Sequence, residues 1–284
     1  MVKIEDFGEF EMSWCPGCGN FSILKALKQA LTASQIPPHK VLHVSGIGQA
    51  AKAPHYMRAN MFNGLHGRSL SSATGARMVN TNLHVIVESG DGCIYAEGGN
   101  HFLATLRRNV DLTLLVHNNQ IYGLTKGQAS PTSDEGFATK FQPDGVTAYP
   151  FNPVAVAVTM KTGFVARGFS GEIDHLAGLI QEAIRHRGLS MIDILQPCVS
   201  FNKVNTFAWY KQRCYKLEQD HDPTDWESAL KKALEWGDRI PIGILYRNKQ
   251  KAPFEERFPV LRKGPLRSQE VDRRTLKEIL WRYA

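Results

Sequence analysis

Short runs of apolar residues recur along the chain and predict the buried strands of one sheet. Each run is rich in valine, isoleucine and leucine and is bounded by Gly, Pro, Asn or Asp. This composition is typical of strands whose two faces are both covered. The runs are residues 41–45, 84–89, 111–117, 164–167, 190–196 and 240–246.

Between these runs, apolar positions repeat with the spacing of amphipathic helices. Residues 154–162 fit a helix or a strand by pattern alone. Strands that alternate with helices favour a parallel sheet with crossover helices. The sequence therefore predicts an α/β fold, a mostly parallel sheet with helices on both faces. The predicted helices cover residues 21–31, 71–79, 101–108, 174–187 and 222–237, with one more near the end of the chain.

Two predicted strands end in polar motifs. Gly90-Asp91-Gly92 follows the run at 84–89, and Asn118-Asn119 follows the run at 111–117. In a βαβ unit both loops lie at the carboxyl edge of the sheet, where open α/β sheets bind ligands. A carboxylate and an amide oxygen there would suit Mg²⁺ that holds a phosphate group. The alternative is two ordinary loops, because each motif is common by itself.

The composition is that of an ordinary soluble chain, with 284 residues, 43% apolar and 21% charged. That length suits one large α/β domain, with or without appendages. Its apolar runs are too short to cross a membrane. The start of the chain is acidic and mixed, which argues against a signal peptide. We therefore expect a cytoplasmic protein with no membrane partner.

The formal charge of +7 is concentrated late in the chain. Residues 247–284 hold eleven Lys/Arg against five Asp/Glu, a local net of +6. Nucleic acid would suit such a tail. We favour a solvated, partner-facing surface and expect no nucleic acid, because the tail lacks a nucleic-acid motif and a stacking platform.

Five cysteines are an odd number for a cytosolic chain, which indicates metal or redox chemistry rather than disulfides. Cys15-Pro16-Gly17-Cys18 is a tight knuckle followed at once by a predicted helix. Such a knuckle can direct two thiolates to one cluster. A thioredoxin-like pair or two small core residues are alternatives. We favour the cluster, since no strand precedes the motif. Cys214, in a predicted helical stretch, is expected to be a plain thiol.

These motifs resemble a known family. GDG followed after about 25 residues by NN resembles the thiamine-diphosphate motif. Five further motifs are similar to the β subunit of 2-oxoacid:ferredoxin oxidoreductases. They are WCPGCGN, SGIG, GLHGRS, NNQIYGLTKGQASPTS and QPCVSFN. The resemblance extends from about Trp14 to about Gly243.

The resemblance implies oxidative decarboxylation of a 2-oxoacid with coenzyme A to acyl-CoA and CO₂, with electrons passing to ferredoxin. It also implies a helix at 154–162 and an α subunit without which the chain is inactive. Acidic ferredoxin is the natural partner for the basic tail. We expect an N-terminal arm with the knuckle (1–20), a thiamine-diphosphate domain (21–246) and the basic tail (247–284).

The resemblance assigns site residues by motif. Asp91, Asn119 and the carbonyl of Ile121 would hold Mg²⁺. Lys52, Thr125 and Lys126 would lie nearest the substrate, while Arg68 could reach a phosphate. The residues expected to contact thiamine diphosphate are Ile47, Gly48, Gln49, Ala50, His66, Gly90, Gly92, Cys93, Gly123 and Leu124.

The sequence departs from its family at the iron–sulfur site. A [4Fe–4S] cluster takes four thiolates, and relatives supply one from the glycine turn as SGIGC. Here Gln49 stands at that position, which leaves Cys15, Cys18 and Cys198. An amide is a weak ligand for iron in a thiolate cluster. We expect a labile cluster on three cysteines.

Two other functions stay open. A non-oxidative thiamine-diphosphate decarboxylase subunit would need no cluster. A basic zinc-knuckle module that binds RNA would need a fourth zinc ligand near Cys15 and Cys18, and would bind no thiamine diphosphate.

Overall fold

Eight strands form one sheet in the order β2-β1-β3-β4-β8-β7-β10-β9, and β5 and β6 form a separate hairpin. The computed structural model describes residues 1–217, 221–270 and 272–284. Within those ranges the strands are β1 (Val41–Ser45), β2 (Asn60–Asn63), β3 (His84–Gly90), β4 (Thr113–Asn118), β5 (Ile121–Tyr122), β6 (Gln128–Ala129), β7 (Phe164–Phe169), β8 (Ser190–Leu195), β9 (Cys214–Lys216) and β10 (Ile240–Arg247).

The sheet is mostly parallel. Strands β2, β1, β3, β4, β8 and β7 all pair in parallel, as do β9 and β10. Among the described pairs of this eight-stranded sheet, only β10 and β7 are antiparallel. The carboxyl ends of β1, β3 and β4 therefore meet at one edge, with the loops that follow them side by side.

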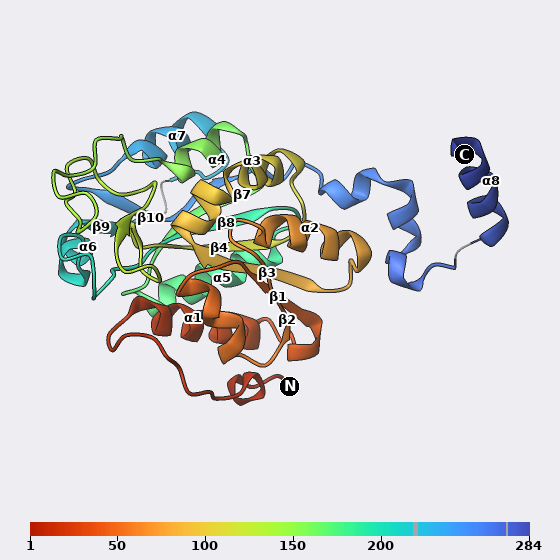
Figure 1. Ribbon diagram of the computed structural model, residues 1–284, viewed down its shortest axis with the longest axis horizontal. Helices are drawn as coiled ribbons and strands as arrows, with labels where there is room; N and C mark the ends of the chain where they lie inside the picture. Colours follow the sequence, from red (N-terminus) through yellow and green to blue (C-terminus); the bar gives the residue numbers. More distant parts are fainter. Residues whose placement is uncertain (218–220, 271) are drawn as a thin grey trace.

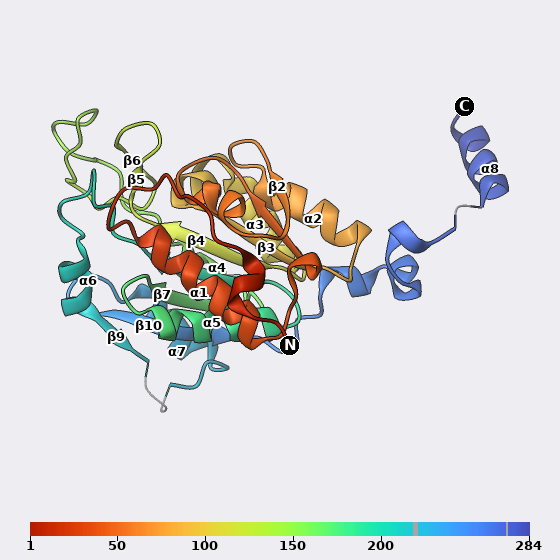
Figure 2. The same cartoon turned by 90° about the horizontal axis from the view of Figure 1, so that it is seen from below.

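Helices cover both faces of the sheet (Figures 1 and 2), which confirms the expected architecture. Helices α1 and α5 pack on one face, while α2, α3, α4 and α7 cover the other. The described α-helices are α1 (Gly19–Ala33), α2 (Ser69–Val79), α3 (Gly99–Arg108), α4 (Pro153–Thr159), α5 (Ile173–Arg185), α6 (Phe207–Arg213), α7 (Trp226–Leu234) and α8 (Arg273–Tyr283).

Alternating strand residues supply the two cores. On β3 and β4, Ile86 and Leu115 face the layer of α1 and α5, whereas Val87 and Leu114 face the opposite layer. All four are almost completely buried. Because side chains alternate across a strand, both faces of a covered strand point into a core, and most of its positions are apolar. This is why the strands appear in the sequence as short apolar runs.

The structure settles or corrects several local expectations. Residues 153–159 form helix α4, which the pattern left undecided. The helix expected from residue 101 starts earlier, because a π-helical turn, Gly92–Glu97, follows Asp91 directly and leads into α3. The expectation that Cys214 lies in a helix is wrong: α6 ends at Arg213 and Cys214 begins β9, since the residue pairs with Ile240 of β10.

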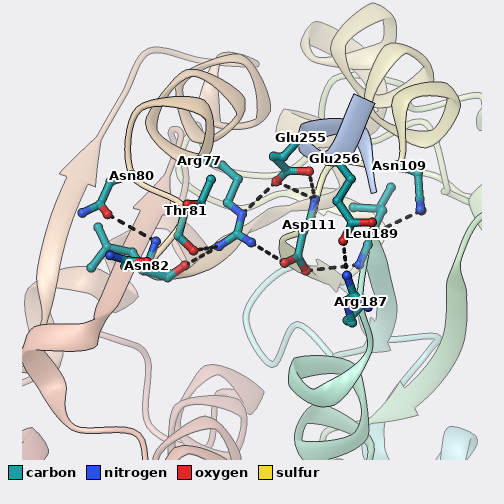
Figure 3. Close-up of polar contacts among 12 residues, drawn as sticks. Arg77, Asn80, Thr81, Asn82, Asn109, Asp111, Arg187, Leu189, Glu255 and Glu256 are labelled. Atoms are coloured by element: carbon teal, nitrogen blue, oxygen red, sulfur yellow. Dashed lines mark hydrogen bonds and ion pairs between the residues drawn. The ribbon is translucent and has the colours of Figure 1, made fainter. Parts of the chain in front are cut away.

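The basic tail is anchored at the amino edge of the sheet. Figure 3 shows the Arg77 guanidinium between the carboxylates of Asp111 and Glu255. Glu255 is only 4% exposed and also accepts a hydrogen bond from the backbone N–H of Asp111. Arg187 pairs with Glu256 beside it. A buried carboxylate with this many donors fixes the start of the tail to α2 and to the residues before β4.

Beyond this anchor the rest of the tail leaves the body of the protein and carries α8 (Figures 1 and 2). All described side chains of α8 are solvent-exposed, including Leu276, Ile279, Leu280, Trp281 and Tyr283. An isolated helix of this length is marginal in water. Within the described ranges, no helix is both long and apolar enough to span a bilayer.

Candidate functional site

The Asp91 carboxylate lies at the carboxyl edge and is 1% exposed. Its Oδ2 accepts three hydrogen bonds, from Ser130 Oγ at 2.6 Å, Thr132 Oγ1 at 2.7 Å and the Gln120 backbone N–H at 3.1 Å. Burial nevertheless raises the pKa of Asp91 to about 6, and the negative charge of nearby Asp193 adds to the rise. A bound cation would stabilise the ionised form of such a buried carboxylate.

Gln120 is held in a strained conformation that directs its N–H to Asp91. Its φ is +60°, a region that L-residues rarely adopt. The side-chain Nε2 donates to the carbonyl of Thr132 at 2.7 Å, and Ser133 Oγ donates to the carbonyl of Gln120 at 2.6 Å. Strain of this kind costs about 1–3 kcal/mol and persists at functional sites because the surroundings enforce it. The sequence analysis missed this residue, which gave no signal beyond following NN.

Tyr122 closes the other side of the loop. Its ring lies against Gly92, where an added Cβ would come within 2.3 Å of the ring, so this position requires glycine. The phenol donates to Glu97 at 3.2 Å, and His66 Nδ1 lies 3.4 Å from the same carboxylate. Burial, followed by the charge of Glu97, raises the pKa of Tyr122. Glu97 was not expected as a site residue.

Cys93 joins three loops from its buried position. Its Sγ accepts the backbone N–H of Gly67 at 3.2 Å, and an added Cβ on Gly46 would lie 2.5 Å from the sulfur. Cys93 therefore packs between the loops that hold Gly46 and Gly67. Arg68 turns away from this point, because its Nη1 lies 2.9 Å from His101 Nε2.

One cavity of about 70 Å³ gathers the expected cofactor residues. All ten side chains or backbone segments expected to contact thiamine diphosphate line it, as do Asp91, Asn119, Ile121 and Thr125. Complete cofactor sites are typically about 300–1,000 Å³. The cavity is therefore large enough for part of a cofactor, and the apolar side chains of Ile47 and Leu124 are exposed at its rim.

The two expected substrate lysines are not among the lining residues. Lys52 Nζ lies 3.4 Å from Ser13 Oγ, and its positive charge helps to lower the pKa of Tyr56. Lys126 is exposed and has a φ of +80°, stabilised by a turn in which Gly127 N donates to the Tyr122 carbonyl.

The three expected cluster cysteines come near one another. Burial raises the pKa of Cys18 to about 11, and the charges of Cys198 and Cys15 raise it further. Ser200 Oγ donates to Cys15 Sγ, and Gln196 Nε2 donates to Cys18 Sγ, both at 3.2 Å. In the described ranges, no three His, Cys, Asp or Glu side chains are arranged to hold one metal ion.

The knuckle also touches the glycine turn. The Trp14 indole N–H donates to the Gln49 carbonyl at 2.8 Å, while Gln49 Oε1 is buried and has no hydrogen-bond partner among the described residues. Gln49 thus lies between the knuckle and the cavity that it lines.

A buried network lies beneath the loops. Glu88 accepts from His43 and His117, each at 2.8 Å, and His117 Nδ1 lies 2.8 Å from Asn20 Oδ1. Burial opposes ionisation of Glu88, but the hydrogen bonds from His117 and His43 outweigh it and lower its pKa to about 2. The network ties α1 to the strands that carry SGIG, GDG and NN. The sequence analysis did not find it.

This fold and cavity define a thiamine-diphosphate-binding protein. Residues 43–194 match the family model for the C-terminal TPP-binding domain of thiamine pyrophosphate enzymes, and residues 198–263 match the C-terminal part of the pyruvate ferredoxin oxidoreductase β subunit. The chain belongs to the β subunits of 2-oxoacid:ferredoxin oxidoreductases, as its relatives show.

Two curated relatives and one solved structure support this assignment. The chain is 46% identical to the 2-oxoacid:ferredoxin oxidoreductase subunit beta of Saccharolobus solfataricus, over 86% of this chain and 85% of that one. It is 45% identical to subunit beta of 2-oxoacid:ferredoxin oxidoreductase 1 of Aeropyrum pernix, over 86% and 80%. A solved 2-oxoglutarate:ferredoxin oxidoreductase from Magnetococcus marinus, with 2-oxoglutarate, coenzyme A and succinyl-CoA bound, matches with a TM-score of 0.91 and 32% identity, over 98% and 96%.

Proposed function

We propose that this chain anchors thiamine diphosphate in a complex that decarboxylates a 2-oxoacid oxidatively, with coenzyme A, to acyl-CoA and CO₂. Electrons leave singly to ferredoxin. The observation that carries the proposal is that one cavity at the carboxyl edge collects Asp91, Asn119, Ile121 and all ten expected cofactor contacts.

Asp91, Asn119 and the carbonyl of Ile121 would hold Mg²⁺ against the diphosphate. The donor set fits a hard cation, because the carboxylate is buried, has a raised pKa and lies next to a second negative group, Asp193. Bound thiamine diphosphate would supply the nucleophilic carbanion and the electron sink for decarboxylation. Gly92 and Tyr122 would shape the slot for the phosphates, and Cys93 would keep the neighbouring loops in contact.

Thr125, Lys126 and Lys52 would face the substrate. Thr125 lies on the cavity wall and carries a hydroxyl that can donate to a carboxylate. Lys126 and Lys52 lie outside the wall, where compact ammonium charges can attract an anionic 2-oxoacid at the entrance.

An α subunit would complete the site. The cavity is smaller than a typical complete cofactor site, and the apolar rim formed by Ile47 and Leu124 is exposed. The end of the basic tail, residues 264–284, carries α8, whose apolar side chains are also exposed. Exposed apolar patches of this kind indicate interfaces. We therefore propose that the chain is inactive alone.

An iron–sulfur cluster on Cys15, Cys18 and Cys198 remains a proposal. The charges of Cys198 and Cys15 act on Cys18, which supports it, but no three described His, Cys, Asp or Glu side chains are arranged to hold one metal ion, and the donor set offers only three sulfurs and the amide of Gln49. The donor set therefore fits a four-thiolate cluster only in part, and the cluster should be labile.

Ferredoxin would approach the edge that holds the knuckle. The basic tail suits this role less well than the sequence suggested, because it leaves the body at the opposite end from the start of α1 (Figures 1 and 2). The Lys251 ammonium is also engaged, donating to the carbonyls of Leu106 and Met160. We keep as proposals the division into an N-terminal arm (1–20), a cofactor domain (21–246) and a basic tail (247–284), and a cytoplasmic location.

The test is activity of the complex reconstituted with its α subunit against a panel of 2-oxoacids, followed with a viologen dye and with ferredoxin. We expect CoA-dependent dye reduction that requires thiamine diphosphate and Mg²⁺. Decarboxylation to an aldehyde without dye reduction would instead indicate a non-oxidative enzyme, and absence of cofactor binding would exclude both.

A further inference from the structure

A second cavity, of about 140 Å³, lies behind the Asp91 loop. It opens between the turn before α4 and Trp236, which lies just after α7, and none of the expected cofactor residues lines it. Its lining includes Asn118, Thr132, Phe151, Arg167, Asp193 and Trp236.

Arg167, on β7, is a buried cation with incomplete hydrogen bonding. It is 2% exposed. Its Nη2 and Nη1 reach only the carbonyls of Ala233 at 3.3 Å and Pro241 at 3.5 Å, and its Nε has no partner in the described parts of the chain. The guanidinium lies 5.6 Å from the Trp236 ring centroid. Buried guanidinium groups are normally paired, so the open N–H indicates a missing acceptor.

Asp193, on the adjacent strand β8, supplies the opposite charge. One oxygen accepts the Tyr95 hydroxyl at 2.7 Å, and Asn118 Nδ2 lies 3.1–3.2 Å from both oxygens. Among the described ion pairs within 4.0 Å, none joins Asp193 to Arg167. The two charges therefore face one cavity without contact, and the carboxylate can accept one further hydrogen bond.

A ligand of this cavity must present two acceptors to Arg167 and one donor to Asp193. A plain carboxylate would satisfy the guanidinium but has no donor to offer the Asp193 carboxylate. We propose that the cavity binds bicarbonate, a planar oxyanion whose hydroxyl donates to Asp193 while its other oxygens accept from Arg167. The volume of the cavity admits an anion of this size.

The site is connected to the cofactor loop by hydrogen bonds. Thr132 Oγ1 lies 2.7 Å from Asp91 Oδ2 and 2.8 Å from Asn118 Oδ1, and Asn118 Nδ2 reaches Asp193. A ligand that repositions Asn118 would therefore alter the metal carboxylate, and by linkage the cofactor would alter bicarbonate affinity equally. If the proposed decarboxylation holds, bicarbonate formed by hydration of the product CO₂ would change the affinity of the chain for its cofactor. Binding itself does not depend on that reaction.

The test is calorimetric titration of the αβ complex with bicarbonate, formate and chloride at one pH, without substrate. We expect saturable bicarbonate binding that is at least about tenfold tighter than formate binding, since a charge-assisted hydrogen bond is worth about 1.5–3 kcal/mol. Asp193→Asn should remove this preference, because an amide oxygen is a weaker acceptor than a carboxylate for the bicarbonate hydroxyl. Arg167→Met should abolish binding of both anions.

A matched control is Arg213→Met, because Arg213 also lies over a tryptophan, 4.5 Å from the Trp209 centroid, but lines no part of this cavity. It should bind bicarbonate like the parent. Equal affinity for formate and bicarbonate in the parent, or unchanged binding in Arg167→Met, would overturn the proposal.

If Arg167→Met does not fold, crystals of the parent complex soaked in bicarbonate decide the question. A planar anion between Arg167 and Asp193 would support the site, whereas water alone at saturating bicarbonate would refute it. These readouts need no turnover, so an inactive complex would count against the proposed reaction without affecting this result.

Discussion

Thr132 and Asp91 are 41 positions apart, yet the Thr132 hydroxyl donates to the Asp91 carboxylate at 2.7 Å inside the protein. The same hydroxyl lies 2.8 Å from Asn118 Oδ1, next to the second expected metal ligand, Asn119. One threonine thus orients both halves of the proposed magnesium site. Groups that hold ligands in this way are often nearly as important as the ligands.

Thr132→Val should weaken binding of Mg²⁺ and thiamine diphosphate by about 10–100-fold, because it removes the donor without changing the shape of the side chain. Calorimetry on the αβ complex measures this affinity. Thr224→Val, at an exposed turn, is the control and should bind like the parent. Parental affinity in Thr132→Val would show that the contact does not support the site.

The raised pKa of Asp91 predicts a pH dependence of stability in the cofactor-free protein. The folded pKa is about 6 against an ordinary value of 3.8. Between these values the folded state binds the proton more tightly, so stability should fall as pH rises from about 4 to about 6, by up to about 3 kcal/mol. Mg²⁺ and thiamine diphosphate should reverse this loss above pH 6, since a cation favours the ionised form.

Thermal melting of the cofactor-free complex between pH 4.5 and pH 7 provides the measurement. Asp91→Asn should lack this component of the pH dependence and should no longer be stabilised by cofactor. Identical pH profiles in variant and parent would contradict the assignment.

Glu88→Gln should destabilise the protein by about 3 kcal/mol or more, because both histidine N–H groups lose a buried carboxylate. The pKa of Glu88 is lowered to about 2, so its contribution is complete above about 4.5 and disappears as pH falls toward 2. Urea unfolding at neutral pH tests this, with exposed Glu227→Gln as the control. A difference below about 1 kcal/mol would mean that the network is dispensable.

Leu276→Glu with Leu280→Glu should weaken association with the α subunit by about tenfold or more, because the change places charges on the exposed apolar face of α8. Cofactor contacts on this chain should be unaffected. Analytical ultracentrifugation measures the association, and Lys277→Gln on the same helix serves as the control. If the double variant assembles normally, α8 lies outside the subunit interface.

Gln49→Cys should raise the iron and sulfide content per β chain toward about four atoms each, since it restores a fourth thiolate beside the knuckle. Anaerobic iron and sulfide analysis with electron paramagnetic resonance gives the readout. Gln49→Ser separates the gain of a thiolate from the loss of the amide and should leave the iron content low. Unchanged iron in Gln49→Cys would remove the cluster assignment.

The sequence by itself determined the layered α/β fold and the position of the cofactor edge. Strands covered on both faces are apolar at most positions, so residues 84–90 and 113–118 are recognisable from a short window. The glycines and polar residues that follow them mark strand ends in the same local way. For this reason the sequence alone locates Asp91 and Asn119 at the ends of two consecutive predicted strands.

Only the tertiary structure decided which distant groups support that edge. The contacts of His117 with Asn20, and of Asn118 with Asp193, span 97 and 75 positions and depend on α1 packing beneath β4 and on β8 pairing beside it. Strand order is not encoded in the spacing of apolar residues, because every buried strand carries the same pattern. The strained Gln120, the Glu88 network and the cavity between Arg167 and Asp193 arise from that order, through hydrogen bonds that form only once the sheet is assembled.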